Sequence, residues 1–447
     1  MAISTLSYTL MTIVDTWFMG RIGADAVGGV GLGGTGAFAS SCFGIGLLRA
    51  VKVVAAQARG GGRPIDALRA LGSGVWAALP LTALCGAFGL GLLHVLPCVA
   101  GDNRATAIAE RYLGLRLCGT PLILLSCAIR ESLYGASDSR SPMRAALLAN
   151  LAHIPLNYAL VFWFELGFVG AAYATLAVQL LELALLWHAQ HNHGFGLRDV
   201  TRHDVIRLFI VGAPIGVEFF LGVGAFAALV ILVARMGSSE LAAHQIAIQI
   251  THLAFMPTVA IGEAASVLAG NAVGAREDSQ VHRIASAALA IASGYACICS
   301  IAFLCFARPL FLVFTADSAT IDVGTRLLCV AALFQLLDAG NIVSRSVLRG
   351  AGDIRVPVAV ATIAGWLLLP SLTYWFGIRL GYGAVGGWGA LTAETATIGT
   401  VLWVRLRTGG WRYAAEQARQ RMTAPSTDAY LSSHALDIAV QPPPASQ

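Results

Sequence analysis

The chain alternates between long apolar runs and short polar segments, and the runs predict its helices. Each run is long enough to cross a bilayer as an α-helix, which takes about 20 apolar residues. We expect six such spans in each half of the chain. They fall at residues 1–19, 27–57, 71–96, 107–134, 142–164, 167–190, 207–234, 241–270, 281–306, 322–349, 355–377 and 383–405. The pattern therefore predicts an all-α membrane protein with twelve transmembrane helices.

The second half of the chain repeats landmarks of the first half in the same order. Gly-Ala-Ser-Asp at 135–138 returns as Gly-Ala-Gly-Asp at 350–353. Other pairs at nearly the same separation are Arg21-Ile22-Gly23 with Arg235-Met236-Gly237, Gly61 with Gly274, and Gly167-Phe168-Val169-Gly170 with Gly383-Ala384-Val385-Gly386. Duplicated halves in so apolar a chain indicate a secondary transporter. Because six is an even number of spans, we expect two parallel six-helix lobes related by a pseudo-two-fold axis along the membrane normal.

Composition agrees with a protein built for lipid. Hydrophobic residues make up 57% of the 447 residues, charged residues make up only 12%, and the mean hydropathy is +0.72. A soluble domain carries about 25% charged residues. The nine cysteines include no metal-spaced pair, and the chain has no Gly-x-x-x-x-Gly-Lys-Ser/Thr phosphate loop. We therefore expect neither an enzyme, nor a bound cofactor or metal, nor a nucleic-acid partner.

The placement of arginine predicts the orientation in the membrane. Loops after even-numbered spans hold most of the arginines, among them Arg59, Arg63, Arg69, Arg140, Arg144, Arg276 and Arg355. The positive-inside rule puts these loops and both termini in the cytoplasm. We expect a multi-pass protein of the inner (plasma) membrane.

The spans and the polar segments divide the chain into four regions. Residues 1–190 form the N-terminal lobe, 191–206 a cytoplasmic linker, and 207–406 the C-terminal lobe. Residues 407–447 turn polar and end in a run of prolines, so we expect a disordered cytoplasmic tail.

The repeat also indicates that the first span is short. The seventh span opens with Pro214, and the matching position of the first span would fall before Met1. We expect a first helix that lacks its opening turn or two, with the true start codon upstream of Met1; the alternative is that this variant starts abruptly.

Five short motifs occur in order along the chain. They are Val14-Asp15-Thr16 with Gly23, Ala242-Ala243-His244-Gln245-Ile246, Ala269-Gly270-Asn271-Ala272-Val273-Gly274-Ala275, Phe334-Gln335-Leu336-Leu337-Asp338-Ala339 and Leu348-Arg349-Gly350-Ala351-Gly352-Asp353. Together they resemble the multidrug and toxic compound extrusion (MATE) family, in its NorM/DinF-like bacterial branch, across residues 1–406. The resemblance implies two lobes facing a central cleft, and antiport of H⁺ or Na⁺ against amphiphilic, often cationic, drugs or toxic metabolites.

The resemblance also leaves a second transport function open. Flippases of lipid-linked saccharides share the architecture, although they usually have more spans, and they are the alternative. In either case we expect a monomer in the lipid bilayer that binds a small amphiphilic molecule.

Charged side chains inside the spans are the candidate functional residues, because a buried charge in a membrane is costly. The resemblance marks Asp15 as a proton- or sodium-responsive acid and Asp338 as a second acidic site. Glu218 faces the same lobe as Asp338, one turn before the family's usual acidic position at Gly222, and we expect it to substitute for that acid or to join Asp338. The alternatives are a solvated Asp15 near the outer interface and a structural hydrogen bond at Glu218.

The resemblance further implies that two positions of the fifth span complete the ion site around Asp15. In this chain those positions hold His153 and Asn157, so the second carboxylate of the sodium-binding pattern is missing. Proton coupling through Asp15, with His153 as a titrating neighbour, is then favoured. The alternative is that His153 merely bonds a backbone carbonyl.

Two basic residues are unusual in the second span. The repeat places Arg49 opposite Gly262, which lies beside Glu263 of the eighth span. We hypothesise that Arg49 or Lys52 pairs with Glu263 and latches the lobes on the cytoplasmic side. The alternative is that both bases reach to the inner headgroups.

Three further acids lie within spans. We expect Glu131 to form a local pair with its neighbour Arg130. Glu182 and Glu394 receive no role from the sequence.

Overall fold

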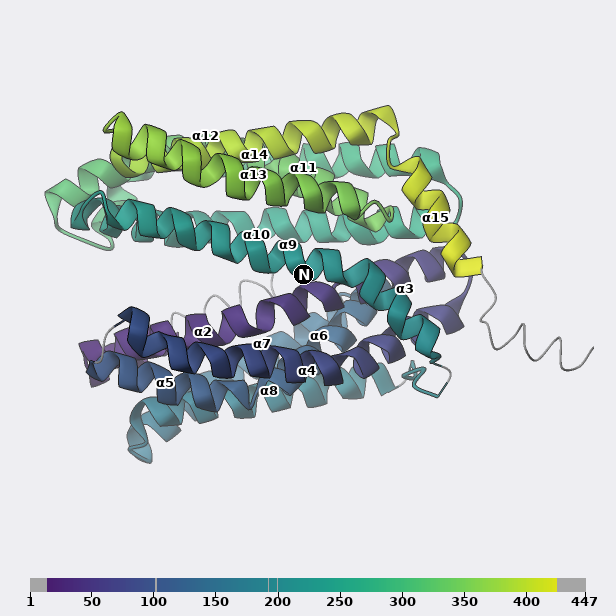
Figure 1. The fold of residues 1–447 in the computed structure, drawn as a ribbon, viewed down its shortest axis with the longest axis horizontal. Helices are drawn as coiled ribbons and strands as arrows, with labels where there is room; N and C mark the ends of the chain where they lie inside the picture. The colour runs from purple at the N-terminus through teal and green to yellow at the C-terminus, as the bar shows by residue number, and fades with distance from the viewer. Residues whose placement is uncertain (1–13, 101–102, 192, 199, 424–447) are drawn as a thin grey trace, which may run out of the picture.

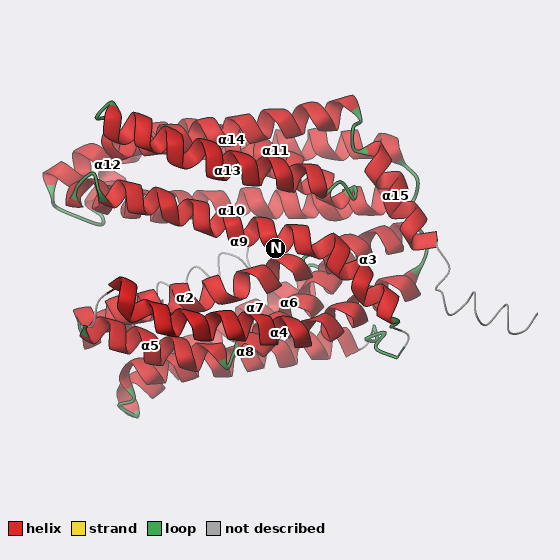
Figure 2. Cartoon of the chain, viewed as in Figure 1, coloured by secondary structure: helices red, strands yellow, loops and turns green. Residues whose placement is uncertain are grey.

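The computed structural model describes residues 14–100, 103–191, 193–198 and 200–423. Every regular element in these ranges is helical (Figures 1 and 2). Residues 14–22 are helical, and the labelled helices are α2 (Ala24–Leu48), α3 (Ala50–Gly60), α4 (Pro64–Ala100), α5 (Arg104–Leu117), α6 (Thr120–Gly135), α7 (Arg140–Tyr158), α8 (Gly167–His191), α9 (Arg202–Ala234), α10 (Ser238–Gly274), α11 (Asp278–Leu312), α12 (Ser318–Gly350), α13 (Arg355–Thr373), α14 (Gly383–Thr408) and α15 (Arg412–Thr423). Short π-helical turns η1 (Ala159–Trp163) and η2 (Tyr374–Arg379) follow α7 and α13.

These helices coincide with the apolar runs of the sequence. Nine spans in the described ranges are long and apolar enough to cross a membrane, and the bent pair of α5 and α6 raises the number to ten. The pair bends by 51° at the break between Leu117 and Thr120, and Pro121, in the first turn of α6, cannot continue a regular helix from α5. The chain is therefore an all-helical membrane protein. The expected first span, 1–19, lies largely outside the described residues.

The helices form two groups that follow the order of the chain. In Figure 1 the purple and blue helices α2 and α4–α8 fill the lower part of the view, and the teal to yellow helices α9–α14 fill the upper part. Small side chains dominate the contacts inside each group, for example Ala265, Ala269 and Ala292 in the upper one. Small residues let helix backbones approach closely in lipid, where packing replaces the hydrophobic effect.

The sequence repeat is visible in the backbone. Each copy has a π-helical turn at the same place, since η1 and η2 precede Gly167 and Gly383, which both have positive φ. Gly23 and Gly237, also a matched pair, both lie directly before a helix with φ of 148° and 135°. The matched residues therefore adopt matched conformations.

The two groups meet most closely where α3 crosses α10. A Cβ atom at Gly60 would lie 2.0 Å from the carbonyl oxygen of Asn271, and one at Gly274 would lie 2.0 Å from that of Gln57. Neither contact has room for a side chain. The Gln57 side chain also donates a hydrogen bond to the carbonyl of Gly350, at the end of α12 (3.0 Å). Backbone therefore meets backbone between the lobes at this end of the molecule.

The end of the chain differs from the expected disordered tail. Residues 412–423 form α15, which lies across one end of the upper group (Figure 1). Trp411 is fully buried, and Arg419 donates to the carbonyl of Val273 (3.0 Å) and pairs with Asp278. The expectation of disorder is wrong for these residues because polar composition hid a buried tryptophan and an arginine that caps α10. Residues 424–447 lie outside the described ranges.

Trp411→Ala should release α15 from the upper group. Truncating a buried tryptophan costs about 3–5 kcal/mol, which exceeds what a 12-residue helix supplies on its own. Limited trypsin digestion of the purified protein should then cleave within α15 several times faster. Tyr413→Ala removes an aromatic side chain that is 76% exposed and should leave the rate unchanged. Equal rates for both variants would show that Trp411 does not hold α15.

Candidate functional site

The N-terminal group of helices encloses a polar cluster around Asp15. The side chain of Asp15 is 16% exposed and accepts a hydrogen bond from Asn157 Nδ2 at 2.5 Å. His153 lies one turn earlier on α7, with Nε2 at 3.5 Å from Asp15 Oδ1. His153 and Asn157 are fully buried. The fold thus brings together the three residues that the sequence grouped, and Asp15 is largely shielded rather than solvated.

The polar atoms of this cluster are not all satisfied within the protein. Neither ring nitrogen of His153 has a hydrogen-bond partner in the described structure, so the backbone bond considered for it is not seen. The Oδ1 atom of Asn157 is likewise buried without a partner. Buried polar groups usually have partners. The cluster therefore has free capacity to bind a proton, an ion or a polar group of a substrate.

Two residues of α5 belong to this cluster, although the sequence did not single them out. Tyr112 is buried and packs in one apolar cluster with Val14 and Phe18, on either side of Asp15. Arg116, one turn after Tyr112, interacts electrostatically with Asp15 and Tyr112. Its position inside an expected span was a signal in the sequence, because a charge there is rarely idle.

The C-terminal group holds a second acidic cluster, between α12 and α14. Asp338 is 4% exposed and accepts a hydrogen bond from Asn341 Nδ2 at 3.0 Å, while its Oδ2 atom has no partner in the described structure. Glu394 of α14 is also buried, and it interacts electrostatically with Asp338 and Arg345. The sequence singled out Asp338 but gave Glu394 no role. Only the packing of α14 on α12 brings the two carboxylates to the same cluster.

Glu218 does not pair with Asp338. It lies on α9 and binds two guanidinium groups of α12, with Arg349 Nη2 at 2.5 Å and Arg345 Nη1 at 3.3 Å. Arg345 also interacts electrostatically with Asp338, so it links the two acids indirectly. The geometry matches the structural alternative for Glu218, because both of its oxygens are held by arginines of one helix.

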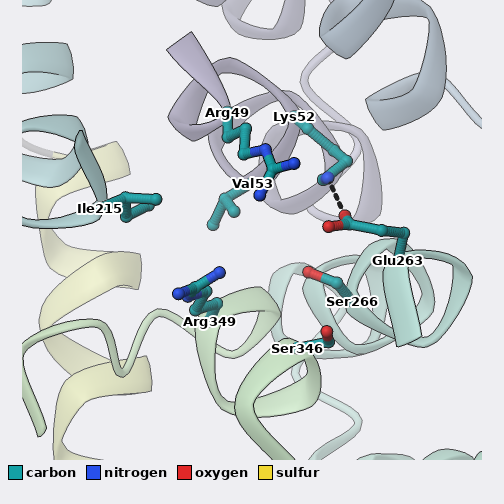
Figure 3. A pocket seen from close by; sticks show the side chains of 8 residues that line it. All are labelled: Arg49, Lys52, Val53, Ile215, Glu263, Ser266, Ser346 and Arg349. Carbon is teal, nitrogen blue, oxygen red and sulfur yellow. Dashed lines mark hydrogen bonds and ion pairs between the residues drawn. The ribbon is translucent and has the colours of Figure 1, made fainter. Parts of the chain in front are cut away.

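A charged pocket lies between the two lobes, near the crossing of α3 and α10 (Figure 3). Lys52 is 4% exposed and forms ion pairs with Glu131 of its own lobe (3.1 Å) and with Glu263 of the other lobe. Arg49 reaches the pocket but stacks on the ring of Phe219, with 4.9 Å from Cζ to the ring centroid. The pocket has an empty volume of about 280 Å³, including its mouth, and is lined by Arg49, Lys52, Val53, Ile215, Glu263, Ser266, Ser346 and Arg349.

Glu131 and Arg130 do not pair with each other as expected. Arg130 Nη2 lies 3.3 Å from Glu182 of α8, whereas Glu131 lies beside Lys52. Consecutive residues of a helix point about 100° apart. The two side chains therefore reach different helices, α8 and α3, and the expectation of a local pair is wrong.

The comparisons with known proteins agree with this architecture. A family model described as MatE matches residues 1–159 and 214–375. A protein of Bradyrhizobium diazoefficiens named probable multidrug resistance protein NorM is 31% identical over 427 residues, which cover 91% of each chain. Multidrug resistance protein MdtK of Edwardsiella ictaluri is 28% identical over 382 residues, 82% of this chain and 83% of its own.

Solved structures show the same fold. The crystal structure of the eukaryotic MATE transporter AtDTX14 has a TM-score of 0.84 and 18% identity, and the match covers 94% of this chain and 96% of that one. A MATE transporter in the straight conformation has a TM-score of 0.84 and 20% identity, with 92% and 95% covered. The chain therefore belongs to the MATE family of multi-pass membrane transporters, and it is not assigned to an enzyme family.

Glu218→Gln should destabilise the protein, because it removes a buried carboxylate from two partly buried arginines. Removing one partner of a buried ion pair costs about 3–5 kcal/mol. The thermal unfolding midpoint in detergent should fall by several degrees. Asp25→Asn breaks an exposed pair with Arg104 (3.9 Å) and should change it little. An unchanged midpoint for Glu218→Gln would show that this ion pair does not hold α9 to α12.

Proposed function

We propose that this MATE protein exports amphiphilic, often cationic, small molecules in exchange for protons or sodium ions by alternating access. The observation that carries the proposal is a shielded carboxylate in each lobe, Asp15 with a side chain 16% exposed and Asp338 at 4%, each with unsatisfied polar atoms in its cluster. Neutralising a carboxylate removes the charge that attracts a cationic substrate, which couples the two flows. The relatives named multidrug resistance proteins NorM and MdtK support this substrate class.

The proposed architecture has twelve spans in two parallel lobes. The ten candidate spans become twelve when the helix at 14–22 and α14 are added. The matched backbone conformations of the two copies support a pseudo-two-fold relation along the membrane normal. The arginine-rich loops put the crossing of α3 and α10 on the cytoplasmic side of the inner membrane.

The proposed conformation is closed on the cytoplasmic side. Gly60 and Gly274 bring the lobes into backbone contact at this end, and Lys52 reaches from one lobe to Glu263 of the other. We take the Lys52–Glu263 pair as a latch that must separate when the cleft opens inward. Glu131, at 3.1 Å from Lys52, would keep the ammonium group paired during that step. An unpaired charge in this buried position would cost several kcal/mol.

The flippase alternative lacks a comparable observation. Its cleft would need free cationic groups to hold a pyrophosphate, and Arg49 and Lys52 were the residues that could supply them. In the structure Lys52 is bound by two carboxylates and Arg49 is stacked on an aromatic ring. This arrangement supports the drug antiporter, and we expect it to act as a monomer with its cleft inside one chain.

Asp15→Asn should abolish coupled export. The amide cannot take up a proton and cannot supply the negative charge that a cation needs. Efflux of a cationic dye from proteoliposomes, driven by a pH gradient and by a sodium gradient in separate experiments, should fall to the rate of passive leak. Asp322→Asn, at an exposed position, serves as the control. Full exchange by Asp15→Asn under either gradient would overturn the mechanism.

The latch predicts that two conservative substitutions change the distance between the lobes at the cytoplasmic end in opposite directions. Glu263→Gln removes the partner in the other lobe and should favour separated lobes at the cytoplasmic end. Glu131→Gln removes the partner in the same lobe, makes Lys52 depend on Glu263, and should favour closed lobes. Spin labels at Arg59→Cys and Ser279→Cys, in a background without the nine native cysteines, report the distance across this end. Shifts of the same sign, or none, would contradict the latch.

A further inference from the structure

Arg116 is a partly buried cation with no carboxylate in direct contact. It lies in the last turn of α5, and its Nε and Nη1 atoms are buried without a hydrogen-bond partner in the described structure. No carboxylate of the described residues lies within 4.0 Å of its guanidinium nitrogens. Buried guanidinium nitrogens that are left without a partner are costly. The presence of Arg116 inside a membrane span therefore calls for a functional reason.

The positive charge of Arg116 acts on the carboxylate of Asp15. Tyr112, one turn before Arg116, packs with Val14 and Phe18, so this face of α5 lies against the helix that carries Asp15. Arg116 also interacts electrostatically with Asp15 and with His153. The carboxylate itself is held by Asn157, at 2.5 Å, and leaves the guanidinium group at a distance. Arg116 therefore acts on the Asp15 cluster electrostatically, without touching the carboxylate.

The formal charges of Asp15, Asn157 and Arg116 sum to zero. Asp15 contributes one negative charge and Arg116 one positive charge, while Asn157 is neutral. Oxygen atoms of the kind that a sodium ion needs are present, because the Asn157 amide that donates to the Asp15 carboxylate also carries the unpartnered Oδ1. The negative charge that a sodium ion needs is already offset. Adding a monovalent metal ion would give the site a net positive charge in a medium of low dielectric constant, where charge is poorly screened.

We infer that Arg116 is the residue that excludes sodium from the Asp15 site and so selects the coupling ion. It acts from a distance as a fixed counter-charge to the carboxylate, which a bound sodium ion would otherwise balance. The inference rests on the proposed function, in which Asp15 is a coupling residue. It makes the N-terminal site of this transporter independent of sodium at physiological concentrations.

The test removes the fixed charge and measures the response to sodium. Liposomes that contain the full-length protein are loaded with ethidium and given an inward sodium gradient at equal pH on both sides. The unaltered protein should show no efflux above leak, whereas Arg116→Gln should show sodium-driven efflux at least tenfold above leak. Arg116→Lys keeps the charge and should behave like the unaltered protein. Arg111→Gln removes an exposed arginine of the same helix and is the matched control.

A second variant reaches the same charge by another route. Asn157→Asp adds a carboxylate next to Asp15 and makes the site negative while Arg116 stays in place, so it should also acquire a sodium response. Sodium-dependent thermal stabilisation in detergent, with choline as the comparison cation, gives a binding readout that needs no transport. Both responses should vanish when Asp15→Asn is added.

The outcomes separate the inference from the proposed function. Sodium-driven efflux by the unaltered protein would overturn the role of Arg116, and so would Arg116→Gln and Asn157→Asp that both stay insensitive to sodium. If Arg116→Gln does not fold, Asn157→Asp alone decides. Absence of efflux under a pH gradient in the unaltered protein would instead remove the proposed proton coupling. The thermal measurement would still show whether Arg116 excludes sodium.

Discussion

A charge inside the bilayer has to be neutralised by another part of the same chain, and this requirement organises the interior of the protein. Water cannot screen these groups, so a single unpaired ion costs several kcal/mol. Lys52 meets the requirement with one carboxylate of its own lobe and one of the other lobe. The contact that neutralises the lysine therefore also joins the lobes, and any movement that separates them has to leave Lys52 a partner.

The two lobes have a similar backbone course, but their charged residues inside the spans differ. Matched glycines and matched π-helical turns give both copies the same course. The acids have no such symmetry, since the position that matches Asp15 in the second copy is Leu229 and the one that matches Asp338 in the first is Ile123. Asp15 has Arg116 nearby, whereas Asp338 has both Arg345 and a second carboxylate, Glu394. The two lobes therefore offer different electrostatic environments to an ion or a substrate.

Local sequence rules succeeded where one helix decides the outcome and failed where several helices meet. Apolar runs located the spans because lipid requires continuous hydrogen-bonded helices. The pair expected between Arg130 and Glu131 was wrong, since their partners lie on α8 and α3. The tail was expected to be disordered from 407, yet the buried Trp411 and the contacts of Arg419 dock α15. A polar segment can be ordered by a few contacts that composition does not reveal.

The sequence by itself determined the helical membrane class, the duplication and the residues worth watching, including Asp15, Asp338, Lys52 and Glu263. Periodicity, length and charge are properties of single segments, and lipid translates them into spans. Only the tertiary structure decided which charges meet. It bound Glu218 to two arginines, placed Arg116 beside the Asp15 cluster and gave Lys52 two carboxylates. Those pairings depend on how helices distant in sequence pack, and no single segment carries that information.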